Sequence, residues 1–86
     1  MTEKQQQIKE GQEAKNLLEN PIIIKTFNIV LNDTYQAWIS TKPEEKEKRE
    51  DLYHQLIAAL KFKQVLMTTQ ENGQLLEEER KEKANG

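Results

Sequence analysis

Residues 21–41 read PIIIKTFNIVLNDTYQAWIST, and their large apolar side chains recur with the period of a helix. At about 100° per residue these side chains share one arc, whereas those of a half-buried strand would alternate. The many β-branched residues leave a strand as the alternative, but a run of about twenty residues without a turn signal favours the helix. The inner stripe of this helix is predicted to comprise Ile23, Phe27, Val30, Leu31 and Trp38.

A longer helix is predicted over residues 43–72, after a short connector. Thr41 and Glu44 have the spacing of a capping box, although Lys42 is an alternative cap because it precedes a proline. Gly73 is the predicted stop, since glycine readily adopts the left-handed conformation that ends many helices. The inner stripe of this helix is predicted to comprise Leu52, Leu56, Leu60, Leu66 and Met67.

A short connector between two long helices makes them antiparallel neighbours, so these two helices are predicted to form a hairpin. An additional helix is predicted over about residues 5–19, where Gly11 interrupts a sparse set of apolar residues. Asn20 and Pro21 separate it from the next helix, because asparagine is a good cap and proline suits the first helical turn. The charged residues after Gly73 predict a partly disordered tail.

These elements define an all-α fold: a long antiparallel helical hairpin with an additional N-terminal helix and a charged, partly disordered C-terminal tail. The 86 residues are expected to form a single helical domain, 1–86, with an ordered part at about 8–76. A chain of this size buries a small share of its surface, so its stability depends on well-packed helices or on association with other chains.

The composition narrows the classes of function. The chain has no cysteine and one histidine, which excludes disulfides and thiolate zinc sites, so we expect no cofactor and no metal. The net charge of −2 disfavours duplex DNA binding by a single chain. Binding of nucleic acid is possible only for an oligomer, in which the positive charges of Lys61 and Lys63 are repeated. The longest apolar run, Ile22–Ile24, falls far short of the about 20 residues of a membrane span, and the first residues lack a signal-peptide core. We expect a cytoplasmic protein without a membrane segment.

His54 lies one turn after Glu50 on the polar side of the longer predicted helix. A catalytic or metal-binding role for this histidine requires further ligands or a nucleophile. The sequence contains no glycine-rich phosphate loop, serine elbow or paired-acid motif. We therefore expect an ordinary surface histidine and a protein that is not an enzyme.

Several apolar residues fall outside both inner stripes. Either the N-terminal helix folds back over them, or they form a contact surface for other copies of the chain. Tyr35, Trp38 and Tyr53 present a similar choice, between an aromatic binding patch and a seal at the connector end of the hairpin. The expected interface comprises Ile57, Phe62, Val65, Ile29 and Ile39.

A pattern of turn signals and core positions extends over about residues 11–73, and it comprises Gly11, Ala14, Leu17, Leu18, Glu19, Asn20, Pro21, Phe27, Tyr35, Trp38, Thr41, Arg49, Glu50, Leu60 and Gly73. This pattern resembles small helical proteins of tailed bacteriophages that are encoded among the head and DNA-packaging genes. The resemblance implies a non-enzymatic interaction or virion assembly protein. Such a protein associates with itself and with another phage or host protein, in the host cytoplasm or the virion. Two alternatives stay open: a DNA-packaging ring protein similar to a terminase small subunit, and an inhibitor of a host protein.

Overall fold

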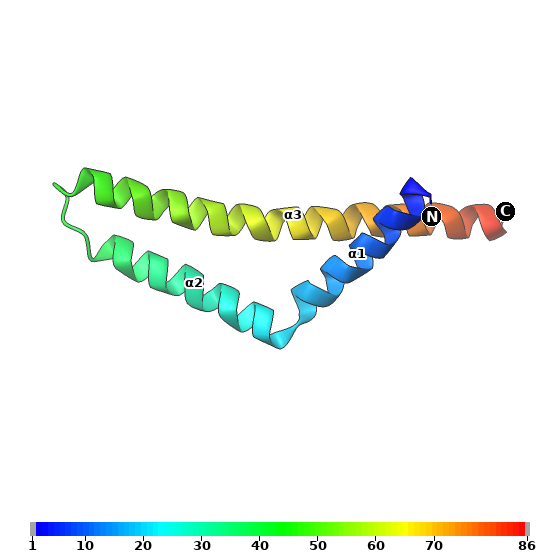
Figure 1. Ribbon diagram of the computed structural model, residues 1–86, viewed down its shortest axis with the longest axis horizontal. Helices are drawn as coiled ribbons and strands as arrows, with labels where there is room; N and C mark the ends of the chain where they lie inside the picture. Colours follow the sequence, from blue (N-terminus) through cyan, green and yellow to red (C-terminus); the bar gives the residue numbers. More distant parts are fainter. Residues whose placement is uncertain (1, 86) are drawn as a thin grey trace. The chain divides into compact units, whose positions relative to one another are not determined.

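Helices account for nearly all of residues 2–85, the part of the chain that this computed structural model describes (Figure 1). In chain order, α1 spans Glu3–Glu19, α2 spans Pro21–Ile39 and α3 spans Lys46–Asn85. No strand occurs within residues 2–85. The all-α class is therefore confirmed, and the strand alternative for residues 21–41 is excluded.

The three helices contribute to two compact units. Unit 1 combines Met1–Asn20 with Gln64–Gly86, so it contains α1 and the C-terminal part of α3. Unit 2 is Pro21–Lys63, which contains α2, the connector and the N-terminal part of α3. The predicted single domain over residues 1–86 and the antiparallel hairpin stay predictions.

Local hydrogen bonds set both ends of α1, through side chains at its start and through the backbone at its end. The Thr2 hydroxyl accepts a hydrogen bond from the amide N–H of Gln5 at 3.1 Å, and the Gln5 side chain accepts one from the Thr2 amide at 3.0 Å. This capping box starts the helix earlier than the predicted residue 5 and before the expected ordered range. At the other end the Asn20 amide donates to the Leu17 carbonyl at 3.2 Å, and Pro21 begins α2 as predicted.

Unit 1 is held by a contact between the backbones of α1 and α3. A Cβ atom placed on Gly73 would lie 2.9 Å from the Gln7 carbonyl oxygen and 2.9 Å from the Gly11 Cα. Such distances leave no room for a side chain, so the two helices meet where both residues are glycine. Ala14, one turn further along α1, is 3% exposed. Gln12 adds a hydrogen bond from its side-chain amide to the Glu77 carboxylate at 3.4 Å.

The predicted stop at Gly73 is wrong, because α3 continues through this residue to Asn85. Gly73 has no positive φ, which a left-handed helix end would require. Its glycine character instead permits the close approach of α1. The predicted disorder of the tail is not confirmed: residues after Gly73 are helical to Asn85, and Lys81 pairs with Glu77 at 3.8 Å.

The connector between α2 and α3 ends in a tight turn. The Glu45 amide donates to the Lys42 carbonyl at 3.0 Å, and the Glu45 carboxylate accepts from the Lys42 amide at 2.9 Å. Pro43 lies at the second position of this turn, where its fixed φ is favourable. Because Pro43 and Glu44 belong to the turn, α3 begins at Lys46 and not at residue 43.

Thr41 does not form the predicted capping box with Glu44. Its hydroxyl donates to the Trp38 carbonyl at 2.6 Å, at the end of α2, and accepts from the Arg49 guanidinium at 2.9 Å. The Arg49 guanidinium also lies over the Trp38 ring, 4.5 Å from its centroid. The buried Thr41 therefore ties the end of α2 to the beginning of α3 within unit 2.

We expect Thr41→Ala to lower the free energy of unfolding by about 1–2 kcal/mol, because a hydrogen bond to a charged group is lost from a buried site. Urea unfolding measures this difference. Ser40→Ala is the matched control: Ser40 also donates to an α2 carbonyl, that of Gln36 at 2.8 Å, but it is exposed. An equal loss in the two variants would contradict a special role for the Thr41–Arg49 bond.

The two predicted inner stripes are only partly buried. Ala14 is the one buried apolar side chain among the described residues, and it belongs to neither stripe. Two helices side by side bury one narrow strip each, and the flanks of the stripe stay open without a further layer. Half-buried members of the predicted core are Phe27, Leu31, Trp38, Leu52, Leu56 and Leu66, whereas Ile23, Val30, Leu60 and Met67 are exposed.

Candidate functional site

The candidate site is the exposed apolar surface of unit 2. Eleven large apolar or aromatic side chains of this unit are between 37% (Ile23) and 66% (Phe62) exposed. In unit 1 the corresponding exposed residues are Leu17, Val65, Met67 and Leu75. The eleven residues of unit 2 are Ile22, Ile23, Ile24, Ile29, Val30, Tyr35, Ile39, Tyr53, Ile57, Leu60 and Phe62.

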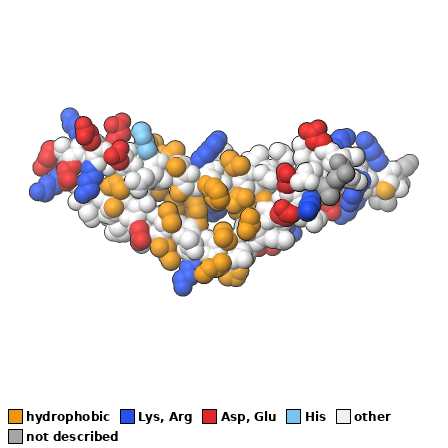
Figure 2. All heavy atoms as spheres, in the orientation of Figure 1, with side chains coloured by type: hydrophobic (Ala, Val, Ile, Leu, Met, Phe, Trp, Pro, Cys, Tyr) orange, Lys and Arg blue, Asp and Glu red, His pale blue; other side chains and the backbone are white. Residues whose placement is uncertain are grey.

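α2 contributes most of this surface. Its 19 residues include one lysine and one aspartate, Lys25 and Asp33, and none of its residues is buried. A helix that is apolar around most of its circumference is usually enclosed by other protein. Figure 2 shows hydrophobic side chains gathered over α2 and the neighbouring part of α3. The described chain therefore presents a helix of interior composition to solvent.

All five residues of the predicted interface are exposed. Ile29, Ile39, Ile57 and Phe62 belong to unit 2, and Val65 belongs to unit 1. Their exposure fits the interpretation that these residues contact other copies of the chain, and that interpretation stays a prediction. Ile23 and Leu60 were predicted to belong to the inner stripes. Both are exposed, and they enlarge the same apolar surface.

The aromatic residues divide between packing and exposure. Trp38 is half-buried against Arg49, and Phe27 is half-buried with the Lys63 ammonium 5.2 Å from its ring centroid. The contacts of these two residues fit a role in packing within unit 2 and not in an aromatic binding patch. Tyr35 and Tyr53 are exposed, so neither seals the connector end in a single chain. Exposed tyrosines beside isoleucines are typical of contact surfaces.

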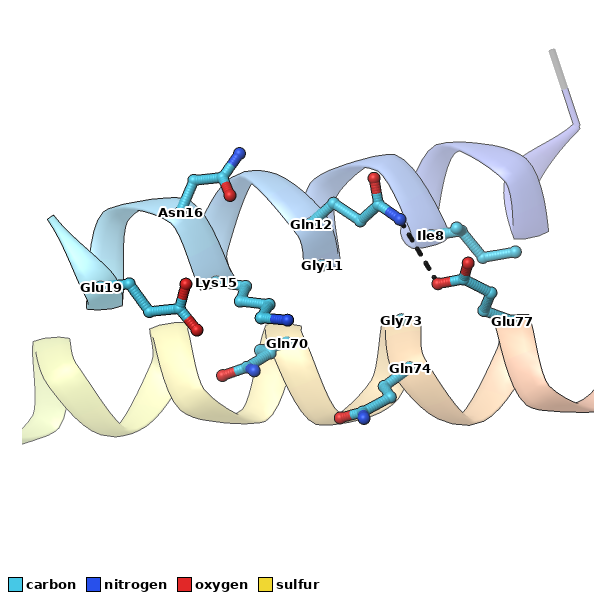
Figure 3. Close-up of a pocket in the computed structure, with 10 residues that line it drawn as sticks. All are labelled: Ile8, Gly11, Gln12, Lys15, Asn16, Glu19, Gln70, Gly73, Gln74 and Glu77. Atoms are coloured by element: carbon cyan, nitrogen blue, oxygen red, sulfur yellow. Dashed lines mark hydrogen bonds between the residues drawn. The ribbon is translucent and has the colours of Figure 1, made fainter.

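Unit 1 contains a polar cleft of about 340 Å³ between α1 and α3 (Figure 3). The two helix-crossing glycines line it together with side chains that are mostly amides or charged. Because most of these side chains are exposed, water can satisfy their hydrogen bonds. The lining residues are Ile8, Gly11, Gln12, Lys15, Asn16, Glu19, Gln70, Gly73, Gln74 and Glu77.

His54 is exposed, and its ring lies 6.1 Å from that of Tyr53, centroid to centroid. Within residues 2–85, no group of three or more histidine, cysteine, aspartate or glutamate side chains is placed to hold a metal ion. None of the helices in this part of the chain combines the length and apolar character that a membrane span requires. The absence of enzymatic activity stays a prediction.

Comparisons with models of protein families, with curated protein sequences and with solved structures give no match.

Proposed function

We propose that this protein is a non-enzymatic assembly protein, which acts by associating with copies of itself through unit 2. The contrast between one buried apolar side chain in the described residues, Ala14, and eleven exposed large ones in unit 2 carries this proposal. An apolar surface of this extent on a small chain indicates a contact that the single chain does not make.

The free energy available from this surface is large relative to the stability of a small domain. Burying the exposed half of a large apolar side chain contributes about 1 kcal/mol, so eleven of them contribute on the order of 10 kcal/mol. A whole domain is typically stable by about 5–15 kcal/mol. Burial of the exposed apolar side chains of unit 2 would therefore stabilise the folded chain beyond what packing within one chain provides. The free-energy cost of association is subtracted from this gain.

A second copy of the chain is the partner that best meets this requirement. The apolar residues of α2 are exposed to water in the folded chain unless another protein covers them. A second copy is available to do so wherever the chain is made. The net charge of −2 opposes self-association only weakly. A nucleic acid would offer phosphates and not apolar groups, so it does not complement this surface.

The antiparallel hairpin predicted from the sequence belongs to the same proposal. Two contacts within unit 2 support it: Trp38, near the end of α2, contacts Arg49, near the beginning of α3. Phe27, earlier in α2, contacts Lys63, later in α3. Earlier residues of one helix meet later residues of the other, as an antiparallel pair requires.

The phage resemblance suggests where such an assembly protein acts. Among the roles that it implies, self-association through an apolar face corresponds to virion assembly in the host cytoplasm, together with another phage protein. The residues of the resemblance include Gly11 and Gly73, which meet in unit 1, and Trp38, Thr41 and Arg49, which join the helices of unit 2. These residues maintain the fold that displays α2.

We expect light scattering on the purified chain at micromolar concentration to give a mass at least twice the 10.1 kDa of one chain. The mass should persist at about 0.5 M salt, because salt screens exposed charges but does not weaken apolar contacts. A monomer mass at all concentrations up to about 100 μM would overturn the proposed function. A mass that falls to that of one chain in high salt would show that charges hold the assembly.

A further inference from the structure

Three exposed residues of unit 2 form a regular stripe along α3. Tyr53, Ile57 and Leu60 are separated by four and then three residues, and they are 53%, 45% and 44% exposed. This spacing is the heptad period, at which side chains of two helices interlock as knobs into holes. The stripe therefore has the form of a helix-packing seam, and in the single chain it faces solvent.

A second seam runs beside the first, one residue earlier at each position. Leu52, Leu56 and Ala59 have the same four-and-three spacing, and all three are half-buried in unit 2. They form the strip of α3 that packing within the unit already covers. α3 thus carries two neighbouring seams of equal period, of which the chain itself uses one.

We infer that the exposed seam receives the same seam of a second copy, antiparallel to it, about a two-fold axis that passes beside Ile57. This inference rests on the proposed self-association and names one of its contacts, the contact that α3 makes. The axis sets Ile57 opposite Ile57 of the second copy. Tyr53, four residues before the axis, then lies within one residue, about 1.5 Å along the helix, of Leu60 of the second copy, which is three residues from the axis. Every residue of the seam then meets an apolar or aromatic residue, with the larger tyrosine facing a leucine.

The charges that flank the seam select the antiparallel direction. Glu50 precedes Tyr53 by three residues, and Lys61 follows Leu60 directly. In the antiparallel arrangement Glu50 of one copy approaches Lys61 of the other, twice by symmetry, and the charges are opposite. In a parallel arrangement the equivalent flanks of the two copies lie on opposite sides of the seam, so this Glu50–Lys61 pair does not form.

Single-cysteine variants test this register, because the natural chain has no cysteine. Ile57→Cys lies beside the axis, so mild oxidation should link two copies rapidly into a dimer on a non-reducing gel. Tyr53→Cys and Leu60→Cys should each stay unlinked alone, since identical positions lie roughly 10 Å apart along the helices, beyond disulfide reach. An equimolar mixture of these two variants, refolded together, should cross-link.

Phe62→Cys is the control for random collision. Phe62 is more exposed than Ile57, 66% against 45%, but lies on another side of α3 and far from the axis. We expect Ile57→Cys to cross-link at least tenfold faster than Phe62→Cys, and the two rates to become equal in concentrated urea. Circular dichroism of the reduced variants checks that each remains helical.

Four results would overturn the inferred contact. Equal native rates for Ile57→Cys and Phe62→Cys would mean random encounter. Self-linking of Tyr53→Cys and of Leu60→Cys would mean parallel seams. An oligomeric wild-type chain whose Ile57→Cys variant does not link would remove the contact and leave the proposed function standing. A monomeric wild-type chain in light scattering would remove both.

Discussion

Gly73→Leu is expected to detach α1 from α3 and to lower the free energy of unfolding of unit 1 by more than about 3 kcal/mol. A first side-chain carbon on Gly73 would already lie 2.9 Å from the Gln7 carbonyl oxygen and the Gly11 Cα. Both are backbone atoms, which cannot rotate away as a flexible side chain does. Because an isolated 17-residue helix is marginal in water, the amides of α1 should lose protection against hydrogen exchange.

Asn72→Leu is the matched control for this variant. Asn72 is exposed in the same turn of α3, and leucine is a better helix former than asparagine or glycine. Asn72→Leu should therefore leave the protection of α1 unchanged. Equal protection of α1 in the two variants would contradict the glycine contact, because propensity alone would then account for both.

Leu56→Asp is expected to unfold unit 2. Leu56 is half-buried in the seam that faces the interior of this unit, and removal of a packed leucine costs about 2–5 kcal/mol. The new carboxylate adds a desolvation cost at the same position. Since small domains are stable by only about 5–15 kcal/mol, α2 should separate from α3. Loss of helicity and a red-shifted Trp38 fluorescence would report this separation.

Gln55→Asp separates the effect of position from that of charge. Gln55 is the exposed neighbour of Leu56 on α3, and it receives the same new side chain. We expect its thermal unfolding to stay within a few degrees of the wild-type midpoint, since surface substitutions usually change stability by less than about 0.5 kcal/mol. A Leu56→Asp variant as stable as Gln55→Asp would show that α2 does not pack on this seam.

The helices were predictable from the spacing of apolar residues along the chain. A helix boundary was predictable only where residues next to it in the sequence set it. The apolar period of residues 21–41 and the Asn20–Pro21 pair predicted α2 correctly, because spacing and backbone preference act within a few residues. The start of α1 was also local, in the Thr2–Gln5 capping box, and reading that spacing would have placed it.

Gly73 and Thr41 show why other boundaries were mispredicted. Each residue type has a common local role, as a helix stop and as a cap respectively. In the fold Gly73 serves the approach of Gly11, and Thr41 accepts a hydrogen bond from Arg49 of α3. Contacts between different helices set the roles of both residues, and helical periodicity does not encode such contacts. The start of α3 itself was set by the local turn from Lys42 to Glu45.

The exposure of the five predicted interface residues followed from helical periodicity, but the extent of the exposed apolar surface did not. Periodicity identifies which side chains share a face, and Phe27, Leu31 and Leu56 of the predicted stripes are half-buried. It does not reveal how many neighbours a face has. Ile23 and Leu60 were therefore assigned to a core that two helices alone are too few to enclose, and they join the exposed surface instead.

The glycine crossing also controls which helix can occupy the place of α1. A protein that displays an apolar helix risks packing that helix wrongly, on its own chain or on a neighbour. α2 contains no glycine, so it cannot bring its backbone as close to Gly73 as Gly11 does. Close packing against Gly73 therefore requires a glycine on the facing helix, which α1 supplies and α2 does not.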